Sequence, residues 1–269
     1  MPESHPASTT VHEAAIAVIM AAGRGTRMGG DLPKVLFEAA GKPLVRWVLD
    51  ALGVAGVTDR IVVVGYRAAL VEETLAGQPG VSFAIQKEQR GTGDAVAAAT
   101  GLIRERLQQG PSAARRPVVI VCGDSPLLRP ESITELLERF STIQAACLLG
   151  TAVTADPTGL GRIVRDTAGK FVGIVEEKDA TPEQRAICEV NMSTYVFEGR
   201  ALLDSLSRLN NANAAGEYYI TDCPGMLLAE GQVVEAVACL DQSETLSVNT
   251  PEQLAAVAAA LAAREPRSF

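Results

Sequence analysis

Short apolar runs alternate with segments of helical periodicity along most of the chain, and this alternation constrains the fold more than any other feature. Residues 15–20 read as the first buried strand, and residues 118–122 are the most strand-like run. Strands alternating with helix-length segments are typical of βαβ units around a mostly parallel sheet. Further strands are expected at residues 60–64 and 81–85, and helices at residues 44–52, 70–75 and 95–107. We therefore expect an α/β, Rossmann-like sheet flanked by helices.

The second half of the chain changes character. Strand-like runs with hairpin-type turns, one of them near residues 168–169, predict a small antiparallel portion, which makes the sheet mixed overall. The runs cover residues 144–153, 162–165, 171–176 and 189–197, and helices at 201–208 and 223–230 and a strand at 233–238 follow. A final helix at 251–264 is expected to begin with Thr250 as N-cap. Nothing marks a linker, so residues 14–265 are expected to form one domain behind a flexible tail of residues 1–13.

The charge balance and the histidine count narrow the function. The chain carries 24 Lys and Arg against 32 Asp and Glu, a net charge of −8, which argues against a nucleic-acid partner because such proteins present basic surfaces. Both histidines, His5 and His12, lie in the expected tail. The chemistry is therefore expected to use carboxylates, amides, cations and backbone groups.

Cysteine usage and the start of the chain predict a location. The five cysteines are odd in number and show no C-x-x-C pattern, which is typical of reduced thiols in a cytosolic protein. The first 13 residues contain no Lys or Arg, unlike a secretory signal, and the apolar run at residues 14–22 is shorter than the roughly 20 residues that span a bilayer. We expect a soluble, cytoplasmic protein with no membrane partner.

A glycine-rich loop follows the first expected strand, where backbone amides can approach a phosphate chain closely. Met28 breaks the dinucleotide fingerprint G-x-G-x-x-G, and Asp31 breaks the P-loop pattern after Gly30. The alternative is a plain turn with solvated cations. In an otherwise acidic chain, three cations beside this loop favour a triphosphate site; they are Arg24, Arg27 and Lys34.

A second motif runs from Gln86 to Ala95, between a strand and a helix. The Gln86 amide can donate and accept hydrogen bonds at once, as recognition of a base edge requires, and Gly91 and Gly93 let the backbone approach a flat ring. The alternative is an ordinary strand-to-helix turn capped by Thr92.

A third motif places Gly123 and Asp124 just beyond the strand at residues 118–122. The carboxyl edge of an open α/β sheet is where ligands bind. Without histidine nearby, Asp124 suits a hard, oxygen-preferring ion such as Mg²⁺. The alternative is a buried Asp that caps the following helix.

In this order, the three motifs resemble those of the sugar-nucleotide pyrophosphorylases, which share the glycosyltransferase-A-like nucleotidyltransferase fold. Further motifs look like the uridylyltransferase half of the bifunctional N-acetylglucosamine-1-phosphate uridylyltransferase/glucosamine-1-phosphate acetyltransferase family. The resemblance covers roughly residues 15–255 and rests on residues 156–163, 174–181 (IVEEKDAT), 189–191, 216–222 (GEYYITD) and 248–249.

The resemblance implies a role for each matching position. It implies that Arg27 and Lys34 contact the nucleotide phosphates and that Asp124 and Asn249 hold Mg²⁺. It also implies a set of residues that bind UTP and a hexosamine 1-phosphate. These are Met20, Ala21, Ala22 and Gly23 around the nucleotide, Gln86, Gly91 and Thr92 at the base and ribose, Cys122 and Gly123 beside the metal, and Gly161, Glu176 and Asn191 around the amino sugar.

Such a reaction fits a chain without an available histidine. A sugar 1-phosphate that attacks the α-phosphorus of UTP is already anionic, so no general base is required. The transition state instead needs alignment and charge neutralisation, which Mg²⁺, Lys34 and Arg27 can supply. The resemblance therefore implies formation of UDP-N-acetylglucosamine and pyrophosphate.

The sequence departs from the family pattern at four places. Asp94 stands where these enzymes usually have His, Cys122 where an aromatic residue is common, and Leu160 where Tyr is frequent. Met192-Ser193 follows Asn191 in place of Thr-Gly. Because two of these changes lie beside sugar-pocket positions, they bear on sugar identity more than on reaction type.

Several alternatives stay open at this point. The hexapeptide-repeat β-helix of the bifunctional members is absent, so either a stand-alone uridylyltransferase or a shortened chain is expected, with no inherited oligomeric state. Other enzymes of the class use another nucleotide or sugar, and a nucleotide-sugar binding protein without turnover would retain similar motifs. An NAD-dependent oxidoreductase is disfavoured by Met28.

Overall fold

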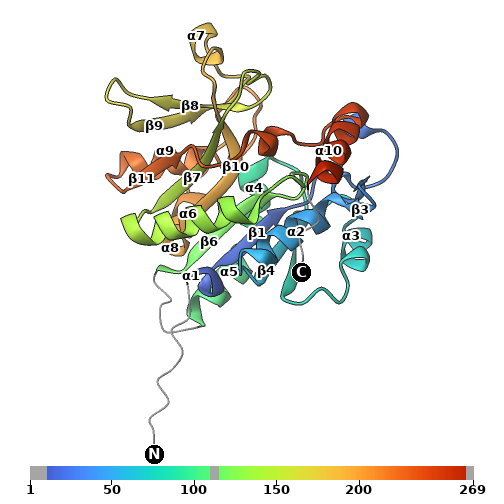
Figure 1. Ribbon diagram of the computed structural model, residues 1–269. Helices are drawn as coiled ribbons and strands as arrows, with labels where there is room; N and C mark the ends of the chain where they lie inside the picture. Colours follow the sequence, from blue (N-terminus) through green and yellow to red (C-terminus); the bar gives the residue numbers. More distant parts are fainter. Residues whose placement is uncertain (1–10, 110–114, 265–269) are drawn as a thin grey trace, which may run out of the picture.

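The computed structural model describes residues 11–109 and 115–264, and its main feature is a nine-stranded sheet covered by helices on both faces (Figure 1). Seven strands run in the order β11-β7-β10-β6-β1-β4-β5, and β8 and β9 extend from β10. The strands are β1 (Ile16–Met20), β4 (Asp59–Val64), β5 (Val81–Ile85), β6 (Pro117–Cys122), β7 (Cys147–Val153), β8 (Gly161–Arg165), β9 (Phe171–Val175), β10 (Glu189–Glu198) and β11 (Val234–Val237).

The pairing confirms a mixed, mostly parallel sheet. Strand β1 pairs in parallel with β4 and β6, β4 with β5, and β7 with β11. Strand β10 is antiparallel to β6 and β7, and the β8–β9 hairpin turns near Gly169, as expected. This hairpin projects beyond the main sheet together with α7 (Pro182–Arg185) (Figure 1).

Alternation of side chains along β1 divides the core in two. Ala17 and Ile19 face one buried cluster, whereas Ile16 and Val18 face the other, because successive side chains of a strand point to opposite faces. Helices α2 (Leu44–Val54), α3 (Ala68–Thr74) and α6 (Pro130–Ile143) cover the first face. The second is covered by α4 (Thr92–Ala98), α5 (Thr100–Gln108), α8 (Gly199–Leu206) and α9 (Asp222–Ala229).

A third, smaller cluster lies outside the two main cores. Helix α10 (Pro251–Ala263) contributes Val257 and Leu261, which pack with Met28 of the glycine loop, Leu127 and Val248. Thr250 caps α10 by accepting a hydrogen bond from Gln253 N at 3.3 Å, as expected. A short hairpin of β2 (Glu38–Ala39) and β3 (Lys42–Pro43) lies beside α10.

Two sequence expectations need correction, and one helix was not anticipated. Residues 11–13, expected in a flexible tail, belong to α1 (Val11–Ala14), where His12 Nδ1 donates to Ala55 O at 3.1 Å; His5 and the rest of that tail lie outside the described residues. The helix expected at residues 95–107 is two helices that meet at Ala99. Helix α6 was not expected, although Pro130 occupies its first position.

The chain reverses direction across the sheet at β1. It runs from β1 through β4 to β5 on one side and then returns to β6 on the other side of β1. Met20 and Cys122 are register partners at the carboxyl ends of β1 and β6. Such a topological switch point is where open α/β sheets bind ligands.

Candidate active site

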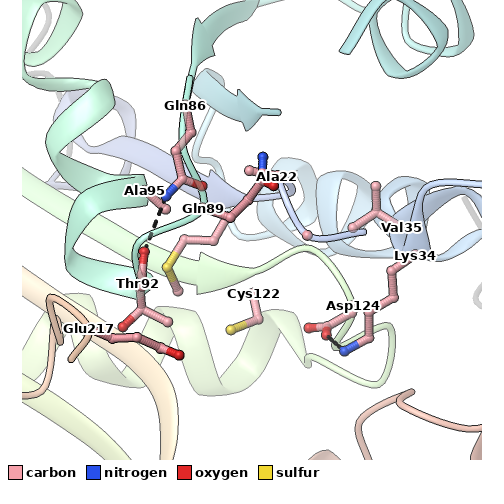
Figure 2. A pocket seen from close by; sticks show the side chains of 13 residues that line it. Ala22, Lys34, Val35, Gln86, Gln89, Thr92, Ala95, Cys122, Asp124 and Glu217 are labelled. Carbon is pink, nitrogen blue, oxygen red and sulfur yellow. Dashed lines mark hydrogen bonds and ion pairs between the residues drawn. The ribbon is translucent and has the colours of Figure 1, made fainter. Parts of the chain in front are cut away.

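A pocket of about 290 Å³ opens at this switch point. Figure 2 shows Gln86 and Thr92 on one side of it, Lys34 and Asp124 on the other, and Cys122 between them. Nine residues expected from sequence line it: Met20, Ala22, Gly23, Lys34, Gln86, Gly91, Thr92, Cys122 and Asp124. Four further lining residues had not been singled out, namely Val35, Gln89, Ala95 and Glu217.

The glycine loop reaches the pocket in a conformation that depends on Gly25. This residue has φ 71° and ψ 46°, and an added Cβ would lie 2.7 Å from Lys34 Cβ. The loop then forms the short helix η1 (Thr26–Met28), and Met28 is buried in the α10 cluster. A glycine at position 28 would have no side chain to pack in this cluster, so the residue that breaks the dinucleotide fingerprint has a structural role here.

Arg24, expected beside the phosphates, lies elsewhere. Its guanidinium stacks on the ring of Tyr66 at 5.0 Å, and Tyr66 Oη donates to Asp31 at 3.2 Å. The cation therefore braces the outer side of the loop. Of the three loop cations, Lys34 lines the pocket, and Arg27 reaches the same end through Asn249.

Two oxygens and two cations form the cationic end of the pocket. Lys34 Nζ forms an ion pair with Asp124 and donates to Asn249 Oδ1 at 2.6 Å, and Arg27 donates to the same oxygen at 2.9 Å. Asn249 Nδ2 donates to Ser247 at 3.1 Å, which turns the amide oxygen toward the cations. Val248 N donates to Asp124 O at 3.3 Å and so brings together segments more than 100 residues apart.

The opposite end is built on backbone contacts between distant segments. Tyr218 N donates to Arg90 O at 2.8 Å, and Gly93 N donates to Tyr218 O at 2.8 Å. A Cβ at Gly91, whose φ is 116°, would lie 2.4 Å from Tyr218 O. These glycines therefore admit the Tyr218 backbone, where the sequence had suggested only a flat ligand ring.

Thr92 does not cap α4, contrary to the alternative considered from sequence. The N-cap of that helix, Gly91, makes no side-chain cap, and Thr92 Oγ1 accepts a hydrogen bond from Ile220 N at 3.1 Å. The Thr92 hydroxyl thus holds the segment around Ile220 against the start of α4.

The three expected sugar-site residues are neighbours of one another, although none of them belongs to the residues that line this pocket. Gly161 pairs with Asn191 across β8 and β10, and an added Cβ at Gly161 would lie 3.6 Å from Glu176 Oε2. Thr221 Oγ1 donates to Glu176 Oε1 at 2.9 Å. Burial raises the pKa of Glu176, opposed by the Thr221 hydrogen bond and reinforced by the charge of Asp222.

The Met192-Ser193 departure has a local structural setting. Ser193 has φ 50°, in the left-handed region that favours glycine, at a bulge between Asn191 and Thr194. Asn191 Oδ1 accepts a hydrogen bond from Ser193 N at 3.2 Å, and its Nδ2 donates to Tyr195 Oη at 2.7 Å. The asparagine is therefore held rigidly although the glycine is missing.

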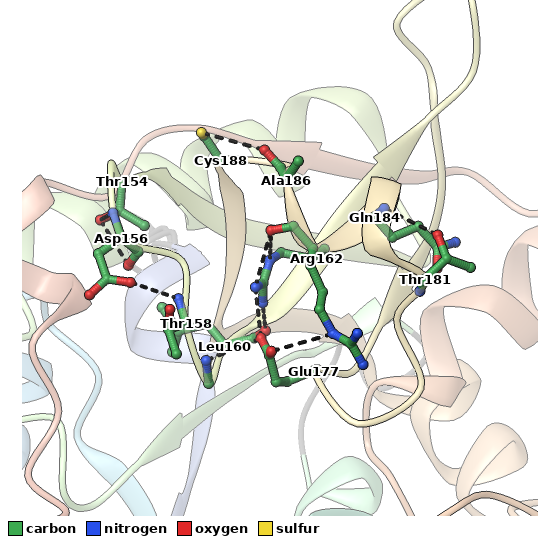
Figure 3. Close-up of polar contacts among 12 residues, drawn as sticks. Thr154, Asp156, Thr158, Leu160, Arg162, Glu177, Thr181, Gln184, Ala186 and Cys188 are labelled. Carbon is green, nitrogen blue, oxygen red and sulfur yellow. Dashed lines mark hydrogen bonds and ion pairs between the residues drawn. The ribbon is translucent and has the colours of Figure 1, made fainter.

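Arg162, on β8 next to Gly161, holds together the loops near the expected sugar-site residues (Figure 3). Its side chain is only 2% exposed, and it donates to Glu177 Oε2 at 2.7 Å, to Leu160 O, and to Arg185 O at 3.4 Å. Glu177 Oε2 also accepts from Gly159 N at 3.2 Å. One buried cation thus connects the loop before β8, the loop after β9 and helix α7.

Cys122 lies at the middle of the pocket and stays protonated near neutral pH. Burial raises the pKa of its thiol to about 12, with a further contribution from the negative charge of Asp124. A neutral thiol is a weak nucleophile. Cys122 therefore shapes the pocket without offering covalent chemistry.

Two expected positions, Ala21 and Gly123, support the pocket from behind its surface. Ala21 is buried and donates its N–H to Val63 O at 2.9 Å, and Gly123 N donates to Met20 O at 2.9 Å. A Cβ at Gly123 would lie 3.1 Å from Met20 O, so a glycine suits this close contact between β1 and β6.

Comparison with known proteins decides the class. The family model for the MobA-like NTP transferase domain matches residues 17–219. The chain belongs to the MobA-like NTP transferase family. It is accordingly a nucleotidyltransferase, and the pocket at the switch point is the candidate active site of this NTP transferase domain.

Curated relatives of this NTP transferase domain are longer proteins. The bifunctional protein GlmU of Geobacter metallireducens is 41% identical over 239 residues, which make up 89% of this chain and 48% of that relative. GlmU of Carboxydothermus hydrogenoformans is 43% identical over 238 residues, 88% of this chain and 51% of the relative. The chain thus spans about half the length of the curated relatives it matches.

Solved structures confirm the fold of the NTP transferase domain. A UDP-glucose pyrophosphorylase complexed with UDP-glucose superposes with a TM-score of 0.71 at 16% identity, covering 92% of this chain and 98% of that one. A putative glucose-1-phosphate thymidylyltransferase from Bacillus anthracis gives 0.73 at 17% identity, covering 95% and 97%. Across residues 11–109 and 115–264, no helix is long and apolar enough to cross a membrane.

Proposed function

We propose that this chain joins UTP and N-acetylglucosamine 1-phosphate to form UDP-N-acetylglucosamine and pyrophosphate, with Mg²⁺ as cofactor. Family membership supports nucleotidyl transfer, and the GlmU relatives support the choice of substrates. The observation that carries the proposal is a pocket with the Lys34–Asp124 pair at one end and the Gln86 amide at the other. We also propose that residues 14–265 form the one nucleotidyltransferase domain.

The oxygens of Asp124 and Asn249 fit a magnesium ion. Both approach the same ammonium group, Lys34 Nζ, so this position already accommodates positive charge. Mg²⁺ is commonly held by one or two protein oxygens together with substrate phosphates, which agrees with the absence of any group of three or more His, Cys, Asp and Glu suited to a metal within the described residues. A bound Mg²⁺ would neutralise negative charge on the phosphate oxygens and help align them.

The side chains around this position bind and neutralise phosphate. Lys34 and Arg27 converge on one oxygen of Asn249, so their charges lie together beside the glycine loop. Preorganised cations stabilise the charge that develops during phosphoryl transfer. The attacking sugar phosphate is anionic, so no residue needs to remove a proton, and the neutral thiol of Cys122 is not required to do so.

Gly161, Glu176 and Asn191 are proposed to hold the amino sugar. Glu176 and Asn191 offer polar side chains that pack close to Gly161, where an added Cβ would lie 3.4 Å from Asn191 Cβ and 3.6 Å from Glu176 Oε2. Both are anchored, by Thr221 and by Tyr195 respectively, so their orientation is set before a ligand binds. We also infer that the enzyme works in the cytoplasm, where UTP is available and where five free cysteines are usual.

The test is a pyrophosphate-release screen with Mg²⁺. Four nucleoside triphosphates are combined with N-acetylglucosamine, glucosamine and glucose 1-phosphates, and products are identified by mass spectrometry. We expect UTP with N-acetylglucosamine 1-phosphate to react fastest and Asp124→Ala to abolish pyrophosphate release. Equal turnover of glucose 1-phosphate would refute the sugar assignment, and nucleotide binding without any product would refute catalysis.

A further inference from the structure

The side-chain amide of Gln86 has one orientation in the pocket. Gln86 is only 4% exposed, and its Nε2 donates to Asp94 Oδ2 at 2.8 Å and to Gly91 O at 3.3 Å. An amide nitrogen carries two hydrogens, so both are used by these contacts. Turning the amide over would place its oxygen against two acceptors. The oxygen Oε1 is therefore the part of Gln86 that can accept a hydrogen bond from a molecule in the pocket.

Asp94 is itself held in place, although it does not belong to the residues that line the pocket. Arg90 donates to Asp94 Oδ1 through Nη2 at 2.7 Å and through Nε at 3.2 Å. The Arg90 guanidinium also stacks over the ring of Tyr218 at 5.4 Å. An ionised carboxylate with one oxygen on Arg90 leaves its other oxygen for Gln86, and it has no hydrogen to donate.

We propose that Asp94 is a specificity-determining positioning residue, which turns Gln86 Oε1 toward the base and makes the pocket select a base with a ring N–H. This inference rests on the proposed function, since it concerns the nucleotide of that reaction. Uracil, thymine and guanine carry a ring N–H of this kind, whereas cytosine and adenine present a lone pair at the equivalent ring nitrogen. Cytosine would therefore bring two acceptors together.

The isosteric substitution Asp94→Asn tests the proposal. An asparagine can offer either a hydrogen or a lone pair to Gln86, so the Gln86 amide becomes free to turn over. A hydrogen bond to a charged partner is worth enough to change affinity about tenfold or more. We expect D94N to lower the UTP-to-CTP ratio of kcat/KM by about tenfold. The UTP-to-dTTP ratio should stay unchanged because both bases carry N3–H.

Two controls separate this role from a general loss of structure. Glu88→Gln removes another carboxylate beside Arg90, whose Nε lies 3.6 Å from Glu88 Oε2, and leaves Gln86 in place. This variant should keep the wild-type UTP-to-CTP and UTP-to-dTTP ratios. In a Gln86→Met background, D94N should have no further effect on the UTP-to-CTP ratio if Asp94 acts through Gln86. An unchanged UTP-to-CTP ratio in D94N, or an equal change in both backgrounds, would overturn the proposal.

Direct binding keeps the two hypotheses distinguishable. The ratio of the calorimetric affinities for UTP and CTP should fall about tenfold in D94N relative to wild type, as the ratio of kcat/KM does. If the wild type makes no nucleotide sugar from UTP, the proposed reaction fails, yet the affinity ratio still decides whether Asp94 sets base preference. If wild-type turnover is normal and D94N keeps the wild-type affinity ratio, the positioning role fails alone.

Discussion

Replacement of Gly25 by alanine should impair catalysis through Lys34. The new Cβ would lie 2.7 Å from Lys34 Cβ, whereas carbon atoms in contact are usually about 3.5–4.0 Å apart. Lys34 must therefore move by about 1 Å, away from Asp124 and Asn249. A misplacement of about 1 Å can reduce the rate about 100-fold, and we expect a loss of that order in kcat for pyrophosphate release.

Gly30→Ala is the matched control. Gly30 has nearly the same φ, 74°, but an added Cβ there meets nothing within 4 Å. Forcing an alanine into the left-handed region costs about 1–2 kcal/mol in either variant, which corresponds to a fall in Tm of about 2–8 °C in a domain of this size. Both variants should therefore lose stability through the strained φ, and Gly25→Ala should lose more because its Cβ also crowds Lys34, while Gly30→Ala should keep most of its activity.

The two variants separate loop strain from lysine displacement. A double variant of Gly25→Ala and Lys34→Ala should be no less active than Lys34→Ala alone, because the first change acts through the second residue. If Gly30→Ala loses as much kcat as Gly25→Ala, strain in the loop explains the loss. If Gly25→Ala retains full activity, the link between Gly25 and Lys34 is refuted.

Three further predictions concern the sugar side and the thiols. Arg162→Met should lower the free energy of urea unfolding by about 2–3 kcal/mol, because buried carbonyls lose their donor, while Arg139→Met on the surface should change it by less than about 0.5 kcal/mol. Burial raises the folded-state pKa of Glu176, so protonated Glu176 stabilises the fold below the unfolded pKa, and this stabilisation is lost as pH rises through the folded pKa. The stability of Glu176→Gln relative to wild type should therefore increase between pH 4 and 8. A difference in unfolding free energy that does not change with pH would refute this. Iodoacetamide at pH 8 should label exposed Cys188 well before Cys122, as mass spectrometry would show, because the pKa of Cys122 is about 12.

The sheet was largely predictable because its strands are dense in β-branched and apolar residues. The run at residues 81–85 coincides with β5, and that at 118–122 falls one residue short of β6. Helix α6 was missed even though its signal is present: Pro130 starts it, and Ile133, Leu136, Leu137 and Phe140 repeat at helical spacing and are buried. Here the sequence contained the information.

The packing partners of the glycines could not be read locally. Gly91 lines the pocket, but the backbone that Gly91 and Gly93 admit belongs to Tyr218, which is more than 120 residues away. Arg24 was expected on phosphates, and its stacking on Tyr66 depends on how two loops meet. Residue type and spacing indicate which chemistry a motif can do, whereas these contacts depend on the tertiary fold.

The position of Asn249 shows how the alanine-rich helix α10 contributes to the site. The backbone N of Asn249 donates to Gln253 Oε1 at 2.8 Å, so the main chain that carries this side chain is tied to the first turn of α10. Helix α10 in turn packs Val257 and Leu261 against Met28, the buried residue of the glycine loop. The same small cluster therefore fixes both the loop that carries Arg27 and the asparagine that Arg27 contacts. Because this cluster is separate from the two main cores, loosening α10 should disturb the cationic end of the pocket before it disturbs the sheet.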